Sequence, residues 1–154
     1  MKRPEDIRVP PRDWVRVLQV AYPFLRNKAG DLLLVGSQAL SLYMKNPLRS
    51  KDLDLLSAQV GFGQIERLSS ELAKMKNVKV TTNTAQTRMF GSRKMTTYGI
   101  ELRIEGRPFI VELFDRVLDG QAPSVLQPYV EPIKRWDLEI WAPDRGHNGS
   151  PPRV

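Results

Sequence analysis

The 154-residue sequence contains no cysteine and only one histidine. The absence of cysteine excludes a disulfide framework, a thiol nucleophile and a zinc site built on thiolates. No apolar run approaches the roughly 20 residues that a membrane-spanning helix needs. The first residues, Met-Lys-Arg-Pro-Glu-Asp, are not followed by the apolar segment of a secretory signal. These absences predict a cytoplasmic protein with no membrane partner.

Acidic residues are the scarcer charge, with 17 Asp and Glu against 24 Lys and Arg, for a formal net charge of +7. Basic surfaces attract polyanions such as nucleic acid at long range. The excess is uneven, because residues 1–30 carry seven basic and three acidic side chains and residues 88–107 carry five and two. Two interpretations stay open: a basic path for a negatively charged partner, or a solvated basic surface.

The length favours one folded domain, because little room is left for a second. Residues 1–11 contain three prolines among charges and are predicted to be an irregular lead-in. Residues 12–142 are predicted to form the domain. Residues 143–154, with two glycines and three prolines, are predicted to be a flexible tail.

Apolar residues at helical spacing predict a helix over about 12–27 and another that ends near Lys76. Pro23 predicts a break near Tyr22, since an internal proline removes a hydrogen bond. Gly30 is predicted to be a left-handed cap that ends the first helix.

A second group of segments has strand character. Residues 78–114 are rich in β-formers and predict several strands, with turns at Asn83, 91–92 and 105–106. Alternation near residues 135–142 predicts a last strand. A helix that starts after Pro132 is the competing interpretation.

The most informative stretch runs from Leu32 to Leu56. Residues 32–35 predict a buried strand, Gly36-Ser37 a tight turn, and residues 37–44 a short helix whose first amides could face a phosphate. Asp52 and Asp54 stand two apart in the next apolar segment, so on a strand both carboxylates share one face. Two such carboxylates repel one another unless a cation lies between them, and Mg²⁺ prefers oxygen ligands of this kind.

Glu112 is the one polar residue in the apolar run 109–114. A buried acid is costly unless it has a partner or a metal, so Glu112 is predicted to join the aspartate pair. The alternative is an edge strand with Glu112 in solvent. Asp115 follows the run and fits the end of a strand.

These residues resemble a known family. Gly36-Ser37, followed by Ala39-Leu40-Ser41-Leu42 and then by Arg49-Ser50-Lys51-Asp52-Leu53-Asp54-Leu55, resembles the DNA polymerase β-like nucleotidyltransferase superfamily. The likeness is greatest to its minimal and AbiEii-type toxin branch. The resemblance covers residues 31–57 and extends to Glu112 as the third acid. It implies a two-layer α+β, palm-like fold with a mixed β-sheet of about five strands flanked by helices.

The resemblance also implies roles for the residues. Asp52, Asp54 and Glu112 are the expected catalytic residues and ligands of Mg²⁺ or Mn²⁺. The expected nucleotide-binding residues are Gly36, Ser37, Arg49, Ser50 and Lys51. An ion pair between Arg49 and one of the aspartates is an equally open interpretation of that residue.

The implied activity moves a nucleoside monophosphate from an NTP to an acceptor hydroxyl with release of pyrophosphate. The basic balance favours an RNA acceptor resembling tRNA, as a toxin-type enzyme would use, while a protein or a small molecule stays open. The helical domain that usually follows is not evident, so acceptor contacts are expected from the strands, the N-terminal helix, a second subunit of a homodimer or a separate protein. The alternatives are an inactive nucleic-acid-binding or regulatory protein, and a nuclease, which needs no triphosphate cradle.

Overall fold

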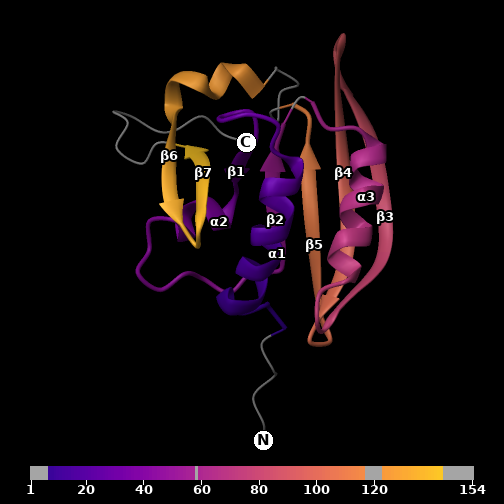
Figure 1. Ribbon diagram of the computed structural model, residues 1–154. Coiled ribbons are helices and arrows are strands. Elements are labelled where there is room, and N and C mark those ends of the chain that lie inside the picture. Colours follow the sequence, from indigo (N-terminus) through magenta and orange to yellow (C-terminus); the bar gives the residue numbers. More distant parts are fainter. Residues whose placement is uncertain (1–6, 58, 117–122, 144–154) are drawn as a thin grey trace, which may run out of the picture.

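The computed structural model describes residues 7–57, 59–116 and 123–143. It shows one mixed β-sheet with helices on it, which confirms the predicted α+β class (Figure 1). The helical elements are α1 (Pro11–Leu25), α2 (Ser37–Ser41), α3 (Phe62–Ala73) and the 3₁₀ helix η1 (Pro123–Tyr129). The strands are β1 (Leu33–Val35), β2 (Asp52–Leu56), β3 (Val78–Phe90), β4 (Arg93–Ile104), β5 (Arg107–Phe114), β6 (Val130–Arg135) and β7 (Leu138–Pro143).

The sheet has the strand order β3-β4-β5-β2-β1-β7-β6. The predicted number of about five strands is therefore wrong, because the described residues form seven. Strand β2 runs parallel to β5 and antiparallel to β1, and β1 runs parallel to β7. The parallel pairing of β2 with β5 sets Asp54 directly opposite Glu112, so the sheet topology decides which acids meet.

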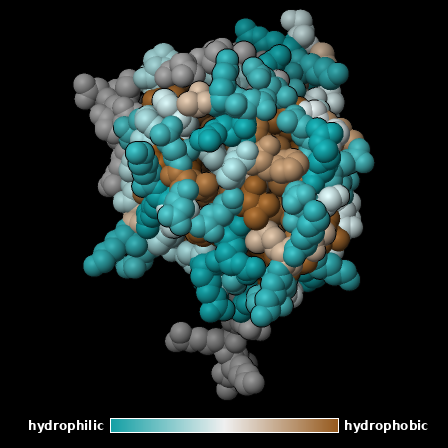
Figure 2. Space-filling view, viewed as in Figure 1, coloured by the Kyte–Doolittle hydropathy of each residue, from teal (hydrophilic) through white to brown (hydrophobic). Residues whose placement is uncertain are grey.

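Helices α1 and α3 cover one face of the sheet (Figure 1). The core between helices and sheet includes fully buried side chains from both layers, among them Trp14, Leu18, Leu53, Leu55, Leu68 and Leu72. A second, smaller cluster contains Leu33, Val35, Leu56 and Leu126 of η1. Seen from the side of α1 and α3, the surface is mostly hydrophilic, with apolar side chains showing between hydrophilic ones (Figure 2).

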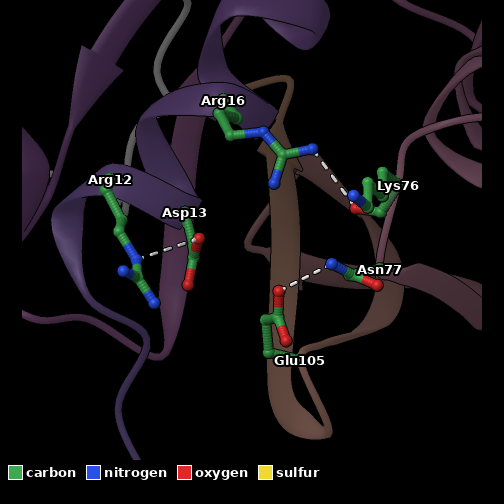
Figure 3. A network of polar contacts seen from close by, with 6 residues as sticks. All are labelled: Arg12, Asp13, Arg16, Lys76, Asn77 and Glu105. Carbon is green, nitrogen blue, oxygen red and sulfur yellow. Dashed lines mark hydrogen bonds and ion pairs between the residues drawn. The ribbon is translucent and has the colours of Figure 1, made fainter.

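Polar contacts tie the start of α1 to the end of the sheet that holds the β4–β5 turn (Figure 3). Arg16 Nη2 donates to the carbonyl of Lys76 over 3.2 Å. Asn77 Nδ2 donates to Glu105 Oε1 over 2.7 Å, and both residues have a positive φ. These contacts close the turns that precede β3 and β5.

Strands β3 and β4 form a hairpin that extends further than the adjacent pairing of β4 with β5. The last pair between β4 and β5 joins Thr97 to Phe114, whereas β3 and β4 continue to the pair Phe90 and Arg93. The end of the hairpin therefore projects past β5 (Figure 1). The predicted turn at Asn83 is wrong. Asn83 lies within β3 and its Oδ1 accepts a hydrogen bond from Ser69 of α3 over 2.6 Å.

The last part of the described chain is a hairpin rather than the predicted single strand. Trp136 and Asp137 form its turn, with φ of +54° and +62°, the pair of positive values that a type I′ turn requires. The competing helix after Pro132 is also wrong. Pro132 lies in β6 at the edge of the sheet, where a missing N–H costs little.

The helices also differ from prediction at their ends. No break occurs near Tyr22: α1 continues past Pro23 to Leu25, where the proline lies in the last turn. Arg26, in an extended conformation, ends α1, whereas Gly30 has a φ of +82° in the turn that follows. Helix α2 ends at Ser41 rather than at Met44, and α3 ends at Ala73, close to the predicted Lys76.

The predicted division into lead-in, domain and tail stays a prediction. Residues 1–6 and 144–154 lie outside the described residues. Residues 7–10 are described, and Val9 among them pairs with Ser50 in an isolated antiparallel bridge. Among the described helices, none is both long enough and apolar enough to span a membrane.

Candidate functional site

The end of β1, the start of α2 and neighbouring positions of β2 and β5 meet at one place. Val35, the last residue of β1, is paired with Asp54 of β2, and Asp54 is paired with Glu112 of β5. Gly36 and Ser37 follow β1 directly and are exposed. The structure therefore brings the Gly-Ser turn, both aspartates and Glu112 together, as a shared site requires.

The three acids form a compact cluster. One carboxylate oxygen from each of Asp52, Asp54 and Glu112 lies within 4.8 Å of the others. All three side chains are half-buried. Alternation along β2 and β5 sends these acids to one face, while Leu53 and Leu55 point into the core on the other. The alternative of Glu112 alone in solvent is thus wrong.

The electrostatics of the cluster favour a cation. Burial, with the charges of Asp52 and then Glu112 as smaller causes, raises the pKa of Asp54 to about 7. Burial and the charge of Asp52 also raise the pKa of Glu112. Three converging carboxylates form the oxygen donor set that hard divalent cations prefer, so these residues fit a metal of that class.

Gly36 makes room for one of these carboxylates. Its backbone lies at φ +73° and ψ −156°, a conformation that is essentially restricted to glycine. A Cβ placed on Gly36 would lie 2.5 Å from Asp54 Oδ2. The glycine therefore allows the acid to approach the turn. Its predicted role in binding a nucleotide stays a prediction, as do those of Ser37, Arg49, Ser50 and Lys51.

Gln38 of α2 is a site residue that sequence reasoning missed. Its side chain is fully buried, and its Nε2 donates to Ser50 Oγ and to the carbonyl of Asp52. Ser50 Oγ donates to the same carbonyl over 2.8 Å. The only local signal is that Gln38 is the one long polar side chain in α2. Gln38 fixes the start of β2 relative to the Gly-Ser turn.

The connector between α2 and β2 is held by contacts from distant elements. Trp14 Nε1 of α1 donates to the carbonyl of Leu48 over 2.9 Å, and the N–H of Leu48 donates to Ser41 Oγ over 3.1 Å. Arg135 Nη1 of β6 donates to the carbonyls of Ser41 and Leu42 over 2.7 and 2.9 Å. Arg135 thereby adds donors at the end of α2, where helix carbonyls run out of intrahelical partners, although the Ser41 carbonyl also accepts from the N–H of Met44 over 3.2 Å.

A cleft of about 500 Å³ lies beside Asp52. It is lined by Arg8, Ser37, Pro47, Leu48, Arg49, Ser50, Lys51 and Asp52. Four of the five predicted nucleotide-binding residues thus share one cavity, and Arg8 joins them from outside the motif. A second cleft of about 380 Å³ shares Lys51 and also includes Glu101 and Ile110.

Comparison with known proteins adds a match of fold. No protein-family model matches the sequence, and neither does any curated protein. A crystal structure of a "putative nucleotidyltransferase from H. pylori" matches with a TM-score of 0.50 and 15% sequence identity. The match covers 81% of this chain and 50% of the H. pylori chain. It supports a nucleotidyltransferase fold and does not extend to the AbiEii-type branch.

Proposed function

We propose that the protein is a metal-dependent nucleotidyltransferase that moves a nucleoside monophosphate from an NTP to an acceptor hydroxyl. The carrying observation is the three-acid cluster beside the Gly-Ser turn and the cationic cleft. A nuclease would need the acids but would have no use for a cleft suited to a triphosphate.

Asp52, Asp54 and Glu112 would hold Mg²⁺ or Mn²⁺. When bound, the metal supplies neutralisation of the charge that builds up on the phosphate oxygens. Ser37, Arg49 and Lys51 bind the phosphates and orient the α-phosphorus towards the acids, whereas Ser50 and Gln38 position Asp52. The acceptor oxygen bonds to the α-phosphorus, and its proton passes to solvent water. The bond to the bridging oxygen breaks, and pyrophosphate leaves with the electron pair.

An RNA 3′ hydroxyl, as in a tRNA-like acceptor, is the acceptor we propose, with a toxin-type role. Residues 78–100 contain four basic and no acidic side chains. By the strand register, Arg88 and Arg93 fall on the same face of the β3–β4 hairpin as Gly99, which is paired with Glu112. Two cationic side chains therefore lie further along the face that carries Glu112, and such side chains attract a phosphodiester chain. A second copy of this chain or a separate protein would supply further acceptor contacts.

The test is transfer of label from an α-phosphate-labelled NTP to RNA in the presence of Mg²⁺ or Mn²⁺. Each of the four NTPs is offered with a mixed cellular RNA extract. We expect wild type to label RNA and Asp54→Asn to lose the activity while its thermal unfolding shows an intact fold. Glu66→Gln, an exposed acid on α3, is the matched control and should keep full activity.

Measurements of Mn²⁺ and NTP binding by the wild-type protein separate the enzyme from the regulatory protein. A wild-type protein that binds neither Mn²⁺ nor any NTP contradicts the proposal. Binding of both without transfer to any acceptor in the extract contradicts the enzymatic part and favours a regulatory, nucleotide-binding protein.

A further inference from the structure

Residues 7–10 are joined to the acid-bearing motif although they lie far from it in the sequence. The N–H of Val9 donates to the carbonyl of Ser50 over 2.6 Å, and the N–H of Ser50 donates to the carbonyl of Val9 over 2.9 Å. Val9 is fully buried in the main core. This segment is thus anchored by a pair of backbone bonds and an apolar side chain, directly beside the residue that Gln38 also holds.

The bridge determines where Arg8 lies. Successive residues of an extended chain point to opposite sides, so the inward position of Val9 turns Arg8 outwards. Arg8 is exposed and lines the 500 Å³ cleft together with Ser37, Arg49 and Lys51. Antiparallel pairing of Val9 with Ser50 sets Arg8 opposite Lys51, next to the first acid.

The cleft has the charge and size for a polyphosphate. Three cationic side chains line it, and Asp52, at the edge shared with the acid cluster, is its one acid. A cavity of this volume holds a small ligand. A guanidinium presents a planar fork of donors that binds two phosphate oxygens at once, which a lysine cannot do.

We propose that Arg8 binds the terminal phosphates of the donor nucleotide and is a specificity residue for triphosphates over monophosphates. The inference rests on the proposed function. Once the α-phosphorus lies at the acids, the rest of the triphosphate has to extend into the cleft that Arg8 lines. The N-terminal segment thereby adds a third cationic side chain to the two, Arg49 and Lys51, that the motif supplies.

The experiment measures binding of inorganic tripolyphosphate to the full chain by calorimetry in the presence of Mg²⁺. Arg8→Gln should weaken this binding about tenfold or more, the range for removal of a charge-assisted hydrogen bond. The tripolyphosphate affinity of Arg8→Lys should lie between those of wild type and Arg8→Gln, because lysine keeps the charge but lacks the fork of donors. Arg12→Gln removes the same charge nearby from an exposed residue outside the cleft, and should bind as wild type does.

Binding of a nucleoside monophosphate distinguishes direct contact with the terminal phosphates from a structural role of Arg8, because loss of a structural role would weaken the binding of both ligands. Arg8→Gln should leave this affinity within about twofold of wild type, the precision expected for a neutral change. Equal tripolyphosphate affinity in wild type and Arg8→Gln would overturn the inference, as would equal losses for the monophosphate and tripolyphosphate.

The inference and the proposed function can fail separately. Arg8-dependent tripolyphosphate binding without any label transfer keeps the inference and removes the enzyme. Label transfer with the same NTP KM in wild type and Arg8→Gln keeps the enzyme and removes the inference.

Discussion

The two faces of β2 and β5 differ although alternate residues of the same strands build them. Towards the helices lie Leu53, Leu55, Val111 and Leu113, each at most 2% exposed. Towards the other side lie Asp52, Asp54 and Glu112, half-buried and within one cluster. One face gains stability by burial of apolar area. The other places like charges together, and burial, with these neighbouring charges as smaller causes, raises the pKa of Asp54. The acids therefore lie on the face opposite the main core, beside the smaller apolar cluster that includes Leu56 of the same strand.

The largest effect should come from the apolar face. Leu55→Ala leaves a cavity among buried side chains and should lower the free energy of unfolding by about 2–5 kcal/mol. Urea denaturation of the metal-free protein measures it. Glu112→Gln, from the neighbouring strand and the opposite face, should unfold at the same or a higher urea concentration. A comparable loss in both variants would break the contrast between the faces.

The close approach of Gly36 to Asp54 can be tested next. Gly36→Ala should cost about 1–3 kcal/mol of stability from backbone strain alone. It should also weaken Mn²⁺ binding, because the new Cβ displaces Asp54 Oδ2. The matched background is Asp54→Ala, in which the contact with Oδ2 is gone, while the backbone strain and a contact of 3.3 Å with the Cβ of residue 54 remain. If Gly36→Ala costs the same in both backgrounds, the two residues are not coupled.

A smaller effect follows from the pKa of Asp54. Its value of about 7 in the folded protein lies above the roughly 3.9 of an unfolded chain. The folded state thus binds more protons between these values, and the stability of the metal-free protein should fall as the pH rises from about 4 to about 7. Asp54→Asn removes the effect and should raise Tm clearly at pH 8, by several degrees for each kcal/mol that the shift costs, and little at pH 4.

The Tm in the presence of Mn²⁺ checks this pH prediction. The metal should stabilise wild type at pH 8 and have much less effect on Asp54→Asn, since binding to the folded state raises its stability. If the Tm of wild type equals that of Asp54→Asn across the whole pH range, ionisation of Asp54 does not destabilise the fold.

The projecting end of the β3–β4 hairpin should give the smallest change. In the double variant Arg88→Gln and Arg93→Gln, the slope of log K against log salt for single-stranded RNA should fall by about 0.7 for each RNA phosphate that the protein no longer neutralises. Fluorescence anisotropy at several salt concentrations measures the slope. Lys74→Gln is the control, because Lys74 pairs with Glu71 at the end of α3 on the other side. An unchanged slope in the double variant would remove the hairpin from the RNA surface.

Local patterns predicted the site-bearing strands, because each pattern acts within a few residues. The apolar run before Gly36, the spacing of Asp52 and Asp54, and the lone acid in residues 109–114 each depend on alternation along one strand. The parallel pairing that sets Asp54 opposite Glu112 joins residues far apart in the sequence. The sequence patterns predicted the two strands but not their register.

The missed features all depend on distant partners. Strand β6 was overlooked because Trp136 and Asp137 continue an apolar-polar alternation while their backbone makes the turn. Gln38 and Val9 act through Ser50, and no local pattern links these three residues. Asn83 looked like a turn residue because its side chain favours turns, yet α3 uses that side chain as a hydrogen-bond acceptor.

The contacts of Arg135 have a consequence for the order in which the chain folds. The guanidinium is 94 residues from Ser41, whose carbonyl it binds at the end of the helix that begins at the Gly-Ser turn. During synthesis Asp52 and Asp54 emerge long before this arginine, so a nascent chain lacks the Arg135 contacts to α2 until the last hairpin is made. The end of α2, beside the acid cluster, therefore receives these contacts from nearly the last described residues to leave the ribosome.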